Sequence, residues 1–213
     1  TNPSSSAITV DATINIGSTA TNGAGDDYTV AGTGTPITFA VGETSKTVTL
    51  TINDDDIDET NETVIVNLTN KSVNSDWGLH QTHTVTIQDN DNAPTVSYAL
   101  LADDEDENTG PVTVAVQLSH PSVFPISVNY SATGGTATTT TDFTLTAGTL
   151  NFAALDTSEN ISFTVVNDTI SEANETIVIG LNTPVNTTID APNSYTYTID
   201  DNDGLPDVSF DLA

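Results

Sequence analysis

The segment Thr51–Val64, with the sequence TINDDDIDETNETV, returns later in the chain as Thr164–Ile177, with the sequence TVVNDTISEANETI. The two segments lie 113 positions apart, and each is followed by an Asp-Asn-Asp triplet, at residues 89–91 and 201–203. This spacing is the length of a small domain, so the chain is expected to hold tandem copies of one unit. A repeated core alone would keep only apolar residues. The repeated carboxylates therefore predict a site for a cation.

The composition excludes several classes of partner. Thirty acidic residues, two lysines and no arginine give a formal net charge of −28. Such a chain repels the phosphates of nucleic acid and the surface of an anionic membrane. The acidic residues gather in loops between strands, whereas a coat that served only solubility would scatter them. The absence of cysteine excludes disulfides and a redox role, and bound metal can replace disulfides outside the cell.

Apolar and polar residues alternate along many short segments, which predicts half-buried antiparallel strands. Gly, Asn, Asp and Pro separate these segments at intervals of about ten residues. We therefore predict an all-β fold of tandem antiparallel β-sandwiches, immunoglobulin-like, with about seven strands each. In the second copy the predicted strands are 95–100, 112–118, 126–132, 143–145, 148–152, 160–166, 175–181 and 195–200.

The copies are expected to occupy residues 1–91 and 92–203, followed by the first strand of a third copy at 204–213. Ile8–Val10 aligns with Ile126–Val128, so the first copy lacks its opening strands. Leu205–Leu212 repeats Ala93–Leu100 and is predicted to be a strand with one apolar face. Two explanations stay open: the chain is an excerpt of a longer array, or subunits join head to tail by strand addition.

The ordered motifs of both copies resemble the Calx-β domain, a calcium-binding β-sandwich of sodium/calcium exchangers and bacterial surface proteins. The first copy carries Asp27-Tyr28, Gly42–Thr47, Asp54–Glu59, Glu62-Thr63 and Asp89–Asp91. The second copy carries Gly135–Ala137, Asp142-Phe143, Gly148–Phe152, Asp168, Glu172, Glu175-Thr176 and Asp201–Asp203.

The resemblance implies Ca²⁺ as the bound ion and two sets of ligands, since calcium takes six to eight oxygens. In the first copy the implied ligands are Asp27, Asp54, Asp55, Ile57 (through its backbone carbonyl), Glu59, Glu62, Asp89 and Asp91. In the second copy they are Glu107, Asp142, Asp168, Glu172, Glu175, Asp201 and Asp203. Glu107 is expected in the turn after the first strand of its copy, a segment for which the first copy has no counterpart. Asn167 and Ser171 replace two of the acidic residues in the second copy.

The expected function is that of a calcium-stiffened spacer or stalk in an adhesin or fibre, extracellular or at the cell surface, with neighbouring repeats as its partners. Residues 92–94 leave almost no linker between the copies, which favours a fixed arrangement. A regulatory calcium sensor is one alternative, and a carbohydrate-binding accessory domain of a secreted enzyme is another. No catalytic motif is present, so we do not expect an enzyme. His80 and His83 lack the further ligands of a zinc site.

Overall fold

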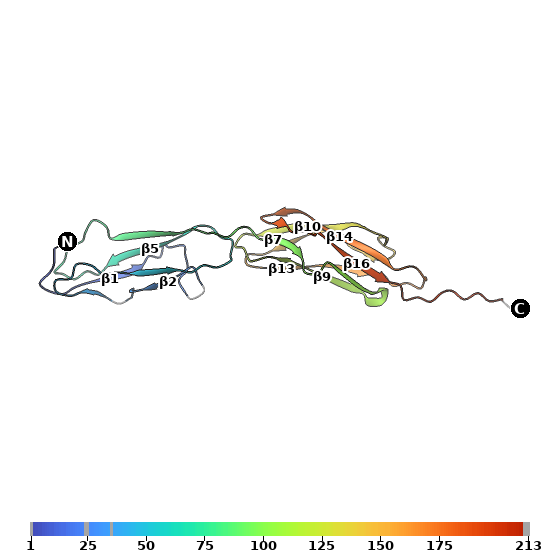
Figure 1. Cartoon of the computed structure of the whole chain (residues 1–213), viewed down its shortest axis with the longest axis horizontal. Helices are drawn as coiled ribbons and strands as arrows, with labels where there is room; N and C mark the ends of the chain where they lie inside the picture. Colours follow the sequence, from blue (N-terminus) through green and yellow to red (C-terminus); the bar gives the residue numbers. More distant parts are fainter. Residues whose placement is uncertain (1, 24–25, 35, 211–213) are drawn as a thin grey trace. The chain divides into compact units, whose positions relative to one another are not determined.

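The chain forms two compact units in the computed structural model, which describes residues 2–23, 26–34 and 36–210 (Figure 1). The first unit comprises Thr1–Asp55 and Thr60–Asn90, and the second comprises Asp56–Glu59 and Asp91–Ala213. The described residues are strands and loops, with one short 3-10 helix, Glu107–Thr109. No helix among them is long and apolar enough to cross a membrane. The prediction of an all-β fold is confirmed.

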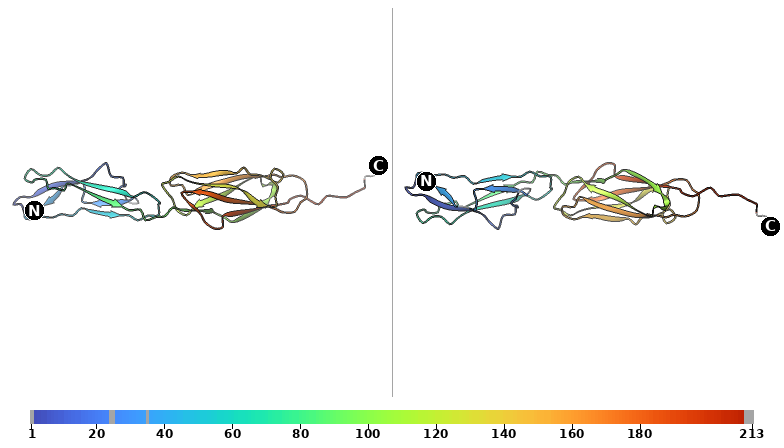
Figure 2. Two further views of the ribbon diagram at one scale, coloured as in Figure 1. Left: turned by 90° about the horizontal axis from the view of Figure 1, so that it is seen from above. Right: turned by 90° about the horizontal axis from the view of Figure 1, so that it is seen from below.

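The first unit has two sheets of unequal size (Figure 2). Its strands are β1 (Ile8–Ile14), β2 (Tyr28–Ala31), β3 (Ile37–Phe39), β4 (Thr49–Ile52), β5 (Glu62–Thr69) and β6 (Thr82–Ile87). One sheet has the order β3-β1-β5-β6, and β2 and β4 form the other. All of these pairs are antiparallel.

The second unit is a sandwich of two five-stranded sheets. Its strands are β7 (Thr95–Tyr98), β8 (Ala102–Asp106), β9 (Pro111–Leu118), β10 (Ile126–Gly135), β11 (Phe143–Thr144), β12 (Gly148–Phe152), β13 (Ser158–Val165), β14 (Glu175–Val185), β15 (Thr188–Ile189) and β16 (Ser194–Asp200). The sheet orders are β12-β10-β14-β16-β8 and β11-β13-β9-β7-β15. Two edge pairs, β15 with β7 and β16 with β8, are parallel, which the alternation of residues did not reveal.

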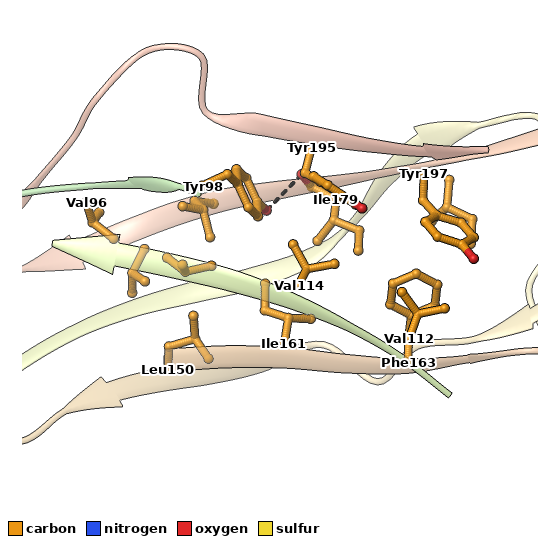
Figure 3. Packing of buried hydrophobic residues seen from close by; sticks show 14 of the residues in the cluster. Val96, Tyr98, Val112, Val114, Leu150, Ile161, Phe163, Ile179, Tyr195 and Tyr197 are labelled. Carbon is orange, nitrogen blue, oxygen red and sulfur yellow. Dashed lines mark hydrogen bonds between the residues drawn. The ribbon is translucent and has the colours of Figure 1, made fainter. Parts of the chain in front are cut away.

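The core of the second unit follows from the period of two in its strands. The inward residues of both sheets face one another in Figure 3, among them Val114, Ile161 and Ile179, which are all buried. Phe163 and Tyr197 pack edge to face with ring centroids 5.2 Å apart. Such a pair contributes about 0.5–1.5 kcal/mol beyond the area that it buries. This core fixes the strand ends from which the loops start.

Two features differ from the sequence prediction. Strand β8 consists of Ala102 and four acidic residues, all exposed, and its lack of an apolar face hid it from a pattern argument. Over residues 205–210 the predicted strand is not formed, because residues 201–210 pair with no other described strand, and Figure 1 draws them without an arrow. Leu212 lies outside the described residues. An isolated apolar alternation predicts a strand only where a partner is within reach.

Candidate calcium sites

An aromatic residue anchors one key carboxylate in each repeat. Tyr28 and Phe143 are both buried at the start of a strand, and Asp27 and Asp142 come directly before them. The burial of each ring fixes the backbone of the preceding aspartate. The Thr138 N–H donates to Asp142 Oδ2 over 2.5 Å, and the Thr21 N–H donates to the corresponding oxygen of Asp27. The sequence thus places these two aspartates in the same way in both repeats.

Two groups of carboxylates form at one end of the second unit. Glu107, Asp201 and Asp203 have ligand oxygens within 4.8 Å of one another, and so do Asp142, Glu172 and Glu175. These residues come from the 3-10 helix after β8, the loop before β11, the loop before β14 with the first residue of β14, and the segment after β16. Because these elements end on the same side of the sandwich, residues nearly 100 positions apart in the chain meet.

A small cavity of about 10 Å³ connects the two groups. This volume is close to that of one water-sized occupant. Six of the seven predicted ligands line it, and its lining contains no basic side chain among the described residues. The carboxylates that line it are Glu107, Asp142, Asp168, Glu172, Glu175 and Asp201.

The buried oxygens in this region fit a cation. Glu107 is buried, and its Oε1 atom has no hydrogen-bond partner among the described residues. The same holds for Asp203 Oδ2. A buried carboxylate oxygen without a donor is costly, and a cation removes that cost by coordination. Several carboxylates around a cavity of ionic size supply the oxygens and the negative charge that Ca²⁺ requires. The residues present therefore fit a calcium ion.

Carboxyl groups raise the pKa of one another in this region. Burial, followed by the interaction with Asp203 and the charges of Asp168 and Asp201, raises the pKa of Glu107 to about 7. Burial, followed by the interaction with Asp142 and the charge of Glu172, raises the pKa of Glu175 to about 7. A bound cation stabilises the ionised forms and would reverse these shifts.

The pKa values of Asp27 and Asp142, which precede Tyr28 and Phe143, are shifted in the opposite direction and are lowered. Burial alone would raise the pKa of Asp142, but hydrogen bonds from the Thr138 N–H and from Glu175 lower it overall. Hydrogen bonds from Thr21 and Glu62 likewise outweigh burial and lower the pKa of Asp27. Each of these aspartates therefore stays ionised beside a glutamate, as an ion-binding residue must.

The first repeat has one group of three carboxylates. Oxygens of Asp27, Glu59 and Glu62 lie within 4.8 Å of one another. They correspond by sequence to Asp142, Glu172 and Glu175. The first repeat has no counterpart of the Glu107 group, since the described residues contain no strand or helix equivalent to β8 and the helix that follows it. The predicted ligands outside the group of three are Asp54, Asp55, Ile57, Asp89 and Asp91.

Matching hydrogen bonds hold the loops of both repeats. The Asp89 N–H donates to Asn61 Oδ1 (3.0 Å), and the Asp201 N–H donates to Asn174 Oδ1 (3.3 Å). Both asparagines lie within the repeated segments Thr51–Val64 and Thr164–Ile177, of which only the carboxylates were predicted to have a role at the site. Their recurrence at one place in both repeats was the available signal that they position the loop that carries the final aspartates.

The structure thus brings together every ligand predicted for the second repeat and three of those predicted for the first. Glu107 lies at the start of the 3-10 helix rather than in a turn directly after the first strand, because β8 intervenes. Ligation by each residue remains a prediction.

A family model for the Calx-beta domain matches residues 6–91 and 95–203. The chain belongs to the Calx-beta family. Calx-beta domains bind calcium, and calcium is also the ion that the carboxylate groups of this chain fit. The match covers both repeats, each of which carries at least one such group.

Curated relatives and one solved structure, the apo form of the Calx CBD1 domain, agree with this membership. The chain is 30% identical over 182 residues to sodium/calcium exchanger 1 of Canis lupus familiaris and 31% identical to that of Rattus norvegicus. The alignments cover 77% of this chain but only 19% and 18% of the two exchangers. A crystal structure of the apo form of the Calx CBD1 domain is similar with a TM-score of 0.50 and 26% identity, over 52% of this chain and 98% of that one. A crystal structure of CBD12 from CALX1.2 covers 92% of this chain and 88% of its own, with a TM-score of 0.49 and 17% identity.

Proposed function

We propose that this chain is a calcium-stabilised structural repeat of a long extracellular or cell-surface protein, where it acts as a rigid spacer. The observation that carries the proposal is the convergence of seven carboxylates at one end of the second unit, with two buried oxygens that lack a donor. Without a cation these groups repel one another and must take up protons. With Ca²⁺ bound, the loops that they come from are cross-linked to the sandwich.

The sequence between the repeats supports a spacer. The two family matches end at residue 91 and resume at residue 95, so only Asn92, Ala93 and Pro94 separate them. A connection of three residues that includes proline limits the orientations open to adjacent domains. Asp89 and Asp91, two of the predicted ligands, come directly before it. Calcium at these residues would order the chain where one repeat leads into the next.

The charge and composition support an extracellular setting. A net charge of −28 suits a protein that meets calcium at the high concentrations found outside cells, where modules bind it with dissociation constants of about 10⁻⁴–10⁻³ M. With no cysteine, the fold has no disulfide, so metal is the cross-link that remains.

A regulatory calcium sensor is the second candidate, because the curated relatives are sodium/calcium exchangers. The chain spans about a fifth of their length, so the activity of the whole exchangers is not carried over. The two functions differ in the affinity that they require. A sensor responds to calcium at about 10⁻⁷–10⁻⁵ M, whereas an extracellular structural module responds at millimolar levels.

Titration of the chelator-treated chain with calcium chloride by calorimetry tests the proposal. We expect binding in the range from tenths of a millimolar to millimolar and, in Asp201→Asn, the loss of at least one binding event. Asp156→Asn is the matched control, since Asp156 is an exposed carboxylate of a turn outside both groups. Micromolar or tighter binding would favour the sensor. Absence of binding would refute both.

A further inference from the structure

A side-chain hydrogen bond joins the same two loops in each repeat. Asn90 Nδ2 donates to Asp54 Oδ1 over 3.3 Å in the first repeat. Asn202 Nδ2 donates to Asn167 Oδ1 over 3.2 Å in the second. The donor is in both cases the middle residue of the Asp-Asn-Asp triplet, and the acceptor lies at the start of the acidic turn that precedes the paired glutamates. We call this bond between the final triplet and the acidic turn the loop clasp.

The clasp of the second unit lies at the rim of the carboxylate site. Asn167 and Asn202 are exposed and are not among the residues that line the cavity. Their neighbours reach inward, because Asp168 and Asp201 both line it. Asp203, on the other side of Asn202, has its buried Oδ2 there. The clasp therefore connects the two segments that carry these three carboxylates.

Further hydrogen bonds fix the orientation of the Asn167 amide. Its Nδ2 donates to Asp168 O over 3.2 Å, so Oδ1 is the atom that accepts from Asn202. The Ile170 N–H donates to Asp168 Oδ1 over 2.7 Å within the same turn. These bonds use only groups of the chain, so they can shape the acidic turn before an ion binds.

The two repeats differ at the acceptor of the clasp and agree at its donor. The acceptor is Asp54 in the first repeat and Asn167, 113 positions later, in the second. Both side chains offer an oxygen at Oδ1, so either residue can accept the bond. The donor, Asn90 or Asn202, is an asparagine in both repeats, and an aspartate there would have no N–H to donate. The residues thus match the needs of a hydrogen bond, whereas a ligand position would favour a carboxylate in both repeats.

The clasp opposes a repulsion between the segments that it joins. Asp168 lies on one segment, and Asp201 and Asp203 lie on the other. The cavity that Asp168 and Asp201 line has no basic side chain in its described lining. In the absence of a cation, these like charges push the two segments apart. An amide donor adds an attraction without adding a positive charge, so it does not repel an incoming calcium ion.

We infer that Asn90 and Asn202 are positioning residues that hold the two ligand-bearing segments of each repeat together before calcium binds, with Asp54 and Asn167 as their acceptors. This inference rests on the calcium sites proposed above. It gives Asp54 a role in place of its predicted ligation, and it explains how an uncharged Asn167 can occupy the corresponding position. Segments that are already in place lose less conformational freedom when calcium binds, so the clasp raises the affinity.

Calcium titration of the nitrogen-15-labelled chain, followed by nuclear magnetic resonance, tests the clasp. The backbone amides of Asp201 and Asp203 report the second unit alone. We expect Asn167→Ala and Asn202→Ala each to weaken binding by about two- to tenfold, the effect of losing one hydrogen bond. The double variant should bind no more weakly than either single variant, because the same bond is lost in all three. Effects that multiply would show that the two side chains act separately, and would overturn the inference.

Two more variants isolate the acceptor role. Asn167→Asp keeps an acceptor, as Asp54 does in the first repeat, and should bind calcium at least as tightly as the parent chain. Asn160→Ala removes an exposed asparagine of β13 and should leave the affinity unchanged. If Asn167→Asp lost as much affinity as Asn167→Ala, the clasp would be refuted, since a carboxylate accepts the same bond.

Solvent exchange of the Asn202 side-chain amide, measured in chelator, tests the clasp without metal. A hydrogen-bonded amide exchanges more slowly, so the rate at Asn202 should be lower than that at Asn160 in the parent chain and should rise to match it in Asn167→Ala. Equal rates at Asn202 in the parent and in Asn167→Ala would contradict the inference. A parent chain whose signals do not respond to calcium would instead refute the proposed function, and these exchange rates would still decide whether the clasp forms.

Discussion

Glu107 and Glu175 each sit among other carboxylates, and the pKa of each is raised to about 7. An acid whose pKa is higher in the folded than in the unfolded state holds its proton more tightly when folded. Its contribution to stability is therefore present at low pH and is lost as the pH rises from the unfolded value, near 4.5, to about 7. Calcium competes with those protons, so the affinity of the site for calcium rises as the pH rises.

We predict that the metal-free chain becomes less stable between pH 5 and pH 8. Over the same window, the increase in melting temperature caused by calcium should become larger. Asp27 and Asp142, with lowered pKa values, act in a different window, since the stability that they provide is lost only below about pH 4. Melting curves with chelator and with calcium at each pH measure both effects. A metal-free melting temperature that rises from pH 5 to pH 8 would contradict this account.

Substitution of Glu107 by glutamine should have effects of opposite sign with and without metal. In chelator, Glu107→Gln removes a buried acid from a group of carboxylates, so the melting temperature should rise or stay level. In calcium, the variant loses a charged ligand, and the affinity should fall by about tenfold or more, equivalent to about 1.4 kcal/mol. Calorimetry and melting curves measure the two effects. Asp156→Asn should change neither. A lower melting temperature in chelator would indicate a purely structural role.

The candidate ligands show how far sequence reasoning reaches at this scale. Repetition pointed to Glu172 and Glu175, because the spacing of 113 residues aligns them with Glu59 and Glu62, whereas Asp27 and Asp142 were implied by the family resemblance. Glu107 has no partner in the first copy, so only the family resemblance could point to it. The sequence could not reveal that Glu107 is buried, since that depends on the 3-10 helix and on how the segment after β16 covers it.

The loop that carries Asp142 starts from a tight contact between two strands. Gly135, at the end of β10, has a φ of 112°, and a Cβ atom placed there would lie 2.0 Å from Thr176 O. The N–H groups of Thr136 and Ala137 both donate to that same oxygen. Only glycine allows this backbone conformation and this approach.

Gly135→Ala should therefore lower the free energy of unfolding of the second unit by more than about 1 kcal/mol, since the native conformation is incompatible with a side chain. The clash also displaces the loop before β11, so calcium affinity should fall as well. Gly204→Ala is the control, because nothing lies within 4 Å of its added Cβ. Urea unfolding followed by circular dichroism measures the change. Equal midpoints for both variants would show that the contact is not tight in solution.

Strand prediction succeeded where one face of a strand is buried and failed at the edges. Apolar and polar residues alternate in β9 and β13 because one face of their sheet packs against the core of the sandwich, and this alternation was visible in the sequence. β15 has two residues, too few to show a period. Whether residues 205–210 form a strand depends on a neighbour, and no pattern within the segment contains that information.

At the scale of the whole molecule, the two repeats differ in the carboxylate groups that they hold. Among the described residues the second unit has two groups of three, and the first repeat has one. A ligand that binds only the folded state adds about 2.7 kcal/mol per site at 100 times its dissociation constant. For a domain of about 100 residues, each kcal/mol shifts the melting temperature by about 4–8 °C.

We therefore predict that chelation lowers the melting temperature of the second unit by on the order of 10 °C or more, and that of the first unit by less. Trp77 is the only tryptophan and belongs to the first unit, so its fluorescence follows that unit, while calorimetry records both transitions. Magnesium at the same concentration is the control, because it binds poorly to sites built from protein oxygens alone. A larger shift in the tryptophan signal than in the second calorimetric transition would reverse this ranking.

Long arrays of similar domains face a hazard during synthesis, because a newly made strand can pair with the wrong copy before its own domain is finished. Strand β8 bears on this hazard. It borders its sheet with four consecutive acidic side chains, all directed to water. The edge of another copy's sheet would also carry negative charge, because the chain has 30 acidic residues and only two lysines. Its approach to β8 would therefore be opposed by electrostatic repulsion. The same acidity that gathers calcium at the loops thus discourages mispairing along this border, and helps each copy to complete its own fold.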